Sequence, residues 1–140
     1  MSQQNVDALK RGLDAYNRRE LDAVLEELDA DVEWHPALAV LLGGERTVFR
    51  GHQGVRESIQ EEDEALAMYQ VEISEIRDLG TSVLAIGRAR VRGKGSGVET
   101  DSAFCVLADS KGTTGKDTRT IRLRTYLDLN EGLEAAGLRE

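Results

Sequence analysis

The amino-acid sequence predicts a single α+β domain. Through the first 66 residues, apolar side chains recur every three or four positions, which is the spacing of one face of a helix. From residue 69 onward the period changes to two, as in strands whose two faces differ. Helices followed by an antiparallel meander are typical of the α+β class. The 140 residues fit one domain, covering residues 1–140, that is large enough to bury a core.

Two short packed helices are predicted at the start of the chain. The apolar stripe of the second helix runs over residues 21–28, and the polar residues 17–19 separate it from the first. Asn17 and Glu20 have the spacing of a capping box at the start of this second helix. The apolar stripe of the first helix consists of Val6, Leu9, Leu13 and Tyr16.

A third helix is predicted after Gly51, where Val55, Ile59 and Leu66 continue an apolar stripe. The ligands of a metal ion must converge on one point. Several acidic residues of this helix instead spread around it. We therefore expect these residues to form a solvated helix surface without a function of its own. They are Glu57, Glu61, Glu62 and Glu64.

Five strands and a final helix complete the prediction. The first strand is short, covers residues 32–35 and ends at Pro36. A glycine-rich turn at residues 93–97 lacks the residue order of a phosphate-binding loop, and a further loop is expected at residues 109–115. The other strands cover residues 69–76, 82–92, 98–108 and 117–126, and the last helix covers residues 129–136.

Composition limits the classes of partner. A formal net charge of -8 argues against nucleic acid or an anionic membrane surface, because both require a positive protein face. The single cysteine, Cys105, has no internal disulfide partner, and we expect it to be an inert buried thiol. No apolar run approaches the length of about 20 residues that a membrane helix needs. We expect a cytoplasmic protein.

The scarce residue types gather in the segment of residues 32–52. It contains the only tryptophan, Trp34, the only proline and both histidines, His35 and His52. We expect this segment, with Leu38 in its apolar run and Phe49 near its end, to form the mouth of a small-molecule cavity. Trp34 would be buried either as a core residue or as a wall of the cavity. His35 is the best candidate for acid/base chemistry, and a structural role at a helix start is favoured for His52.

The predicted strands are apolar on much of both faces, although one face becomes cationic toward Arg92. A sheet of this kind needs cover on both faces, and three helices plus a partner subunit would provide it. We therefore expect a homodimer through one sheet face. On the same strands, Arg88 either binds an anionic ligand or pairs with Asp101, whose carboxylate points inward or lies exposed near a hairpin end.

The order helix, helix, short strand, helix and four-strand meander resembles the nuclear transport factor two-like (NTF2-like) superfamily, and within it the SnoaL-like group. The resemblance implies a curved sheet wrapped against three helices into a cone, with a pocket at its wide end and dimerisation through the sheet. The matching pieces are Leu-Asp-Ala-Val-Leu (21–25), Asp-Val-Glu-Trp (31–34), Phe-Arg-Gly-His-Gln-Gly-Val-Arg (49–56), Tyr-Leu-Asp (126–128) and Leu-Glu-Ala-Ala-Gly-Leu (133–138).

Site residues follow from the same resemblance. His35 falls at or beside the position where ketosteroid isomerases carry a carboxylate base. The tyrosine and aspartate partners of that base align with Gly12 and Phe104, and Tyr16 and Asp101 lie near but off register. The catalytic candidates are therefore His35, Tyr16 and Asp101. The candidates for ligand contact are Trp34, Leu38, Phe49, His52, Arg88 and Phe104.

Members of this superfamily include enzymes and binding modules, so the fold alone does not choose a function. One hypothesis is a cofactor-free isomerase, cyclase or dehydratase that uses His35 for proton transfer on a small apolar metabolite. The alternative is a non-catalytic binding module or dimeric scaffold, and an epoxide hydrolase using Arg88 and Asp101 is a third possibility. The sequence contains no recognised metal-ligand spacing, and we expect no cofactor.

Overall fold

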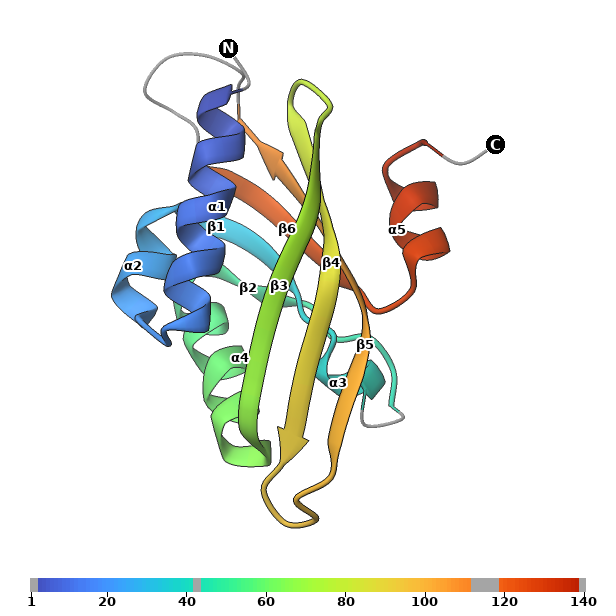
Figure 1. Ribbon diagram of the computed structural model, residues 1–140. Coiled ribbons are helices and arrows are strands. Elements are labelled where there is room, and N and C mark those ends of the chain that lie inside the picture. Colours follow the sequence, from blue (N-terminus) through green and yellow to red (C-terminus); the bar gives the residue numbers. More distant parts are fainter. Residues whose placement is uncertain (1–2, 42–43, 112–118, 139–140) are drawn as a thin grey trace.

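The computed structural model describes residues 3–41, 44–111 and 119–138 (Figure 1). The helices of this part are α1 (Gln3–Asn17), α2 (Leu21–Glu26), α3 (Leu38–Leu41), α4 (Gly51–Ala65) and α5 (Leu129–Ala135). The strands are β1 (Leu28–His35), β2 (Phe49–Arg50), β3 (Leu66–Asp78), β4 (Ser82–Gly93), β5 (Glu99–Ser110) and β6 (Thr120–Tyr126). The predicted α+β class and the order of its main elements are confirmed.

The strands form one curved sheet in the order β2-β1-β6-β5-β4-β3. Among the described strands, only β1 and β6 pair in parallel, and every other neighbouring pair is antiparallel. Figure 1 shows α1, α2 and α4 on one side of this sheet and α5 on the other. We call the side that faces α1, α2 and α4 the inner face and the opposite side the outer face.

The main core lies between the inner face and the three helices. The apolar stripes of α1, α2 and α4 face inward because their residues recur at helical spacing, and they meet the alternate residues of the strands. Val32 and Val55 are completely buried at the centre of this core. Leu38 of α3 belongs to the core, and Phe49 of β2 packs against it.

A second, smaller core lies on the outer face. Leu84, Cys105 and Leu107 point away from the three helices and are covered by α5. A Cβ added at Gly132 of α5 would lie 2.7 Å from Cys105 Cβ, so only glycine allows the helix to approach this closely. The helix therefore covers part of the apolar surface that we expected a partner subunit to cover.

Local details differ from the predictions. The prediction of a capping box was wrong. Glu20 is the residue that precedes α2, and its side chain does not cap the helix. The Asn17 side chain instead forms hydrogen bonds with the backbone of Val71 in β3. Strand β1 starts four residues earlier than predicted, and the short elements α3 and β2 were not predicted. Strand β5 continues to Ser110, and most of the predicted loop at residues 109–115 lies outside the described residues.

No helix in the described ranges combines the length and the apolar character needed to cross a membrane.

Candidate functional site

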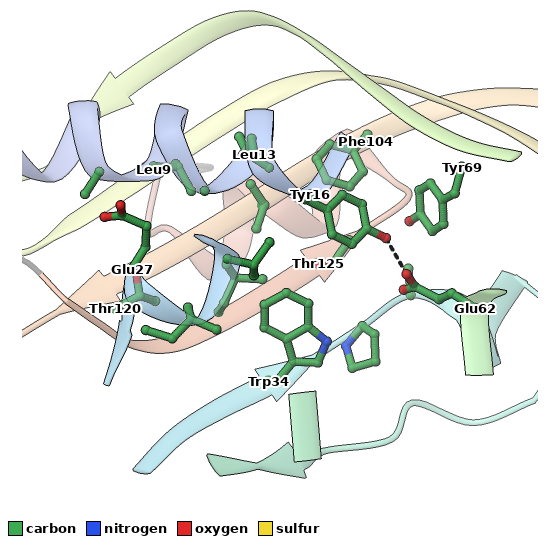
Figure 2. A pocket seen from close by; sticks show the side chains of 18 residues that line it. Leu9, Leu13, Tyr16, Glu27, Trp34, Glu62, Tyr69, Phe104, Thr120 and Thr125 are labelled. Atoms are coloured by element: carbon green, nitrogen blue, oxygen red, sulfur yellow. Dashed lines mark hydrogen bonds between the residues drawn. The ribbon is translucent and has the colours of Figure 1, made fainter. Parts of the chain in front are cut away.

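A largely apolar cavity opens between the inner face of the sheet, α1, α2 and α4 (Figure 2). The volume of the cavity is about 50 Å³. This volume holds a few water molecules or a small organic group without rearrangement. The lining consists of Ala8, Leu9, Gly12, Leu13, Tyr16, Val24, Glu27, Leu28, Trp34, Pro36, Ala37, Glu62, Tyr69, Phe104, Val106, Thr120, Leu123 and Thr125.

Aromatic rings are concentrated in this lining. The chain has one tryptophan, three tyrosines and two phenylalanines, and Tyr16, Trp34, Tyr69 and Phe104 all line the cavity. Tyr16 and Tyr69 meet edge to face, with ring centroids 5.7 Å apart and an interplanar angle of 84°. The α-helix α1 and strands β1, β3 and β5 thus each bring one ring to the same space.

Glu62 is the polar centre of the cavity. It lies in α4, is only 2 % exposed, and its Oε1 accepts a hydrogen bond of 2.6 Å from the Tyr16 hydroxyl (Figure 2). Burial raises the pKa of the Glu62 carboxyl to about 7, against the opposing effects of the Tyr16 hydrogen bond and the nearby Arg19. Burial also raises the pKa of Tyr16 well above its ordinary value, so the phenol keeps its proton.

Arg19 stands behind this pair without being part of the cavity lining. Its guanidinium lies 4.9 Å from the centre of the Tyr16 ring, and Nη2 is 3.5 Å from Glu62 Oε1. The same Nη2 is only 2.5 Å from Asp63 Oδ1, and Nε lies 3.1 Å from that oxygen. Arg19 has a positive φ of 57°, an unfavourable conformation for a residue with a Cβ. The Arg19–Asp63 ion pair and the Tyr16 contact accompany this strained backbone.

Trp34 is held in the cavity wall by α4. Its indole Nε1 donates a hydrogen bond of 3.0 Å to Ser58 Oγ, and Ser58 itself is 2 % exposed. Ser58 and Glu62 are four residues apart, which places them on one face of α4. One helix face therefore orients the indole and supplies the carboxyl.

In Figure 2, Glu27 lies at the end of the cavity opposite to Glu62. Its two carboxylate oxygens accept hydrogen bonds of 3.0 and 3.1 Å from Nε and Nη2 of Arg11, which is an exposed side chain. The charge of Glu27 is thus balanced by a neighbouring cation, in a bidentate geometry. Thr120 lies near Glu27 in the same view.

The comparison with known families agrees with this architecture. A family model described as a SnoaL-like domain matches residues 9–128. The chain belongs to the SnoaL-like family. No curated protein matches this SnoaL-like chain.

Solved structures share the fold at low sequence identity. An NTF2-like protein of unknown function from Burkholderia pseudomallei is 23% identical, with a TM-score of 0.74 over 93% of this chain and 95% of that one. The protein TerC, co-crystallised with polyporic acid, is 21% identical, with a TM-score of 0.73 over 95% and 98% of the two chains. A protein from Catenulispora acidiphila with a ketosteroid isomerase-like fold, in complex with trimethylamine, is 16% identical, with a TM-score of 0.71 over 94% and 93%.

Three of the predicted site residues of this SnoaL-like domain lie together in the cavity lining: Tyr16, Trp34 and Phe104. Leu38 and Phe49 lie in or against the neighbouring core and are not among the lining residues.

His35 lies on the other side of the sheet. Neighbouring residues of a strand point to opposite faces, so Trp34 in the cavity wall directs His35 to the outer face. There its Nε2–H donates to Glu33 Oε1 at 3.2 Å. Burial lowers the pKa of His35, with the charges of Arg124 and Arg46 acting in the same direction. The prediction that His35 acts at the cavity mouth therefore does not agree with its position.

The remaining candidates also lie outside the cavity. Arg88 and Asp101 form an exposed ion pair on the outer face, with Nε 2.7 Å from Oδ1, as the simpler of our two interpretations predicted. They are therefore not placed to activate water inside the cavity. His52, in the first turn of α4, donates from Nε2 to the backbone carbonyl of Leu28 at 3.0 Å, which matches the structural role favoured for it.

Sequence reasoning missed Glu62 by grouping it with solvated acids. Glu57, Glu61 and Glu64 are exposed, whereas Glu62 is buried. A signal was present: position 62 is seven residues after Val55 and so belongs to the same apolar stripe. A charged residue within an apolar stripe is unusual and indicates a buried, partnered side chain.

The arrangement provides a proton donor and acceptor in an apolar space. A carboxyl with a pKa of about 7 is present in both protonation states near neutral pH. Among the residues that the structure describes, no group of three or more His, Cys, Asp or Glu side chains could hold a metal ion.

Proposed function

We propose that this SnoaL-like domain binds a small organic molecule with a largely apolar body and that Glu62 exchanges a proton with it. The observation that carries the proposal is the Glu62 carboxyl, buried in the cavity wall with its pKa raised to about 7. The reaction would be of the isomerase, cyclase or dehydratase type, each of which moves a proton on a carbon skeleton.

The surroundings of Glu62 suit an acid/base role. Efficient proton transfer requires a group whose pKa lies near the working pH, because both its forms are then available. The Tyr16 hydroxyl holds one carboxyl oxygen in place, and Arg19 lies 3.5 Å from the same oxygen. A bound molecule would meet a carboxyl that is already oriented.

Similar structures support a small organic ligand. TerC was co-crystallised with polyporic acid, and the Catenulispora acidiphila protein is in complex with trimethylamine. The limited free space of this cavity favours a ligand of few atoms, or one that displaces side chains from the lining.

Deuterium exchange tests the proposal directly. A fragment collection rich in small ketones is first screened for binding by the NMR shift of the Trp34 indole, which is unique because the chain has one tryptophan. Binders are then incubated with protein in D₂O, and incorporation of deuterium at carbon is measured by mass spectrometry. We expect wild-type protein to catalyse exchange and Glu62→Gln to be slower by a factor of about 100 or more.

Glu61→Gln is the matched control, because Glu61 is the exposed neighbour on the same helix and loses the same charge. It should exchange deuterium at the wild-type rate. Equal rates in the wild type and Glu62→Gln would contradict the acid/base role.

A non-catalytic binding module is the second candidate. It is favoured by the partners that Glu62 already has in Tyr16 and Arg19, since a carboxyl of this kind can be purely structural. Ligands that bind beside Trp34 without any deuterium exchange would support this second function.

A further inference from the structure

We infer that the Glu62 end of the cavity is built to receive a small organic cation, such as a protonated or quaternary amine. The inference rests on the proposed function, because it names the ligand class of the same cavity. Three features carry it: the signs of the charges in the lining, the charge balance around Glu62, and the aromatic rings.

The described part of the lining contains carboxyl groups but no basic side chain. Among the residues that the structure describes, Glu27 and Glu62 are the only carboxylic acids of the lining, and no lysine, arginine or histidine belongs to it. An anionic ligand would therefore be buried beside one or two carboxylates without a cation to receive it, at a large cost in free energy. The cavity thus selects against anions by charge alone.

The cation next to Glu62 is Arg19, and Arg19 pairs more closely with Asp63 than with Glu62. Arg19 contacts Asp63 at 2.5 and 3.1 Å but Glu62 only at 3.5 Å. One guanidinium faces two carboxylates, so this cluster carries a net negative charge when Glu62 is ionised. Glu27 differs, because it has a bidentate partner in Arg11. A cationic ligand would balance the charge at the Glu62 end.

The aromatic rings favour the same class of ligand. Cations bind near aromatic rings because the ring faces are negative, and quaternary amines are recognised in this way. Tyr16, Trp34, Tyr69 and Phe104 converge on the cavity from four different elements. Methyl groups on nitrogen would contact the rings while the positive charge meets Glu62.

Three probes of one shape separate charge from size. Tetramethylammonium, tert-butanol and pivalate are compact branched molecules that carry a positive charge, no charge and a negative charge. Each is titrated into the protein at about pH 8.5, and binding is followed through the Trp34 indole resonance. We expect tetramethylammonium to bind about tenfold or more tightly than tert-butanol, and pivalate to bind most weakly.

Two variants locate the preference. Glu62→Gln should remove the advantage of tetramethylammonium over tert-butanol, whereas Glu61→Gln should keep it. Because Glu62→Gln could alter folding, Phe104→Leu is a second variant: it keeps an apolar wall but removes a ring. In Phe104→Leu, tetramethylammonium should lose more affinity than tert-butanol, so that the ratio of their dissociation constants moves toward 1.

Binding of tetramethylammonium should also weaken from about pH 8.5 to about pH 5.5, since protonation removes the charge of Glu62. The charged and titratable groups that face Glu62 are Tyr16 and Arg19 from the α1 end, Tyr69 from β3, and Asp63 from its own helix. Burial raises the pKa values of Tyr16 and Tyr69, so neither phenol ionises in this range.

The outcomes distinguish this inference from the proposed function. If tert-butanol or pivalate binds as tightly as tetramethylammonium, the preference for a cation is overturned and the small-molecule site stands. The same holds if only neutral ketones shift the Trp34 resonance. If no probe or fragment shifts it, the inference and the proposed function both fail.

Discussion

Glu62 combines burial and ionisation in one side chain, and this should make protein stability depend on pH. Its folded-state pKa of about 7 exceeds the ordinary value of 4.5, so the folded protein holds the proton more tightly than the unfolded chain. The contribution of Glu62 to the free energy of unfolding therefore falls as pH rises from 4.5 to about 7. Partly or fully exposed acids with lowered pKa values, such as Glu33 and Glu99, lose their contributions only in more acidic solution.

Urea unfolding at about pH 5 and about pH 8 measures this effect. We expect wild-type protein to lose up to about 3 kcal/mol relative to Glu62→Gln between these two conditions. Glu61→Gln should follow the wild type. Parallel stability curves for wild type and Glu62→Gln would show that Glu62 titrates normally.

Tyr16 should control the acidity of Glu62. Its hydroxyl stabilises the carboxylate through a hydrogen bond of 2.6 Å, so Tyr16→Phe should raise the pKa of Glu62 further. The loss of this buried hydrogen bond should also cost about 1–3 kcal/mol of stability at neutral pH or above. Carbon-detected NMR titration of the Glu62 carboxyl measures the pKa. Tyr126→Phe, on the outer face, is the control and should leave that pKa unchanged.

Individual residues show what the sequence could and could not predict. Tyr16 was found through the family resemblance, since it lies close to the position of the ketosteroid isomerase tyrosine, and Trp34 because it is unique. His35 was misplaced because a strand alternates: two adjacent residues cannot both face the cavity. Glu62 was missed because three of its acidic neighbours on α4 are exposed, and only its position in the stripe separates it from them.

At the scale of elements, the contact between α5 and β5 depends on one position. A methyl group at Gly132 would lie 2.7 Å from Cys105 Cβ and 3.0 Å from Cys105 Sγ, and β5 lies inside the sheet and cannot retreat. Gly132→Ala should therefore displace α5 and cost about 1–3 kcal/mol of stability. Thermal unfolding measures the loss. The control is Gly95→Ala, in a turn where an added Cβ meets nothing within 4 Å. It should unfold at the same temperature as the wild type.

Long elements were predictable because their periods repeat many times. Helices α1 and α4 and strands β3, β4 and β5 contain enough residues for the spacing of 3.6 or 2 to be clear. The two-residue strand β2 and the four-residue helix α3 contain less than two periods. Tertiary contacts decide such short elements, and the sequence does not show those contacts.

For the whole molecule, association through the outer face of the sheet stays a prediction. Two features of the structure bear on it: α5 covers the apolar cluster around Leu84, and the uncovered part carries paired charges such as Arg88 with Asp101. We expect a homodimer by light scattering coupled to size-exclusion chromatography at micromolar concentration. Arg88→Glu, which places like charges beside Asp101, should shift this equilibrium toward the monomer. A monomeric wild type would exclude the dimer.

The edge of the sheet shows how the fold restricts unwanted association. Strand β3 ends the sheet, and an exposed edge of 13 residues would be a template for strands of other molecules. The Asn17 amide donates to the Val71 carbonyl at 2.8 Å and accepts from the Val71 N–H at 2.9 Å, as a neighbouring strand would do. One side chain thus occupies both backbone groups that an aggregating strand would need at this position. Asn17, the last residue of α1, therefore helps to protect the edge strand against amyloid-like growth.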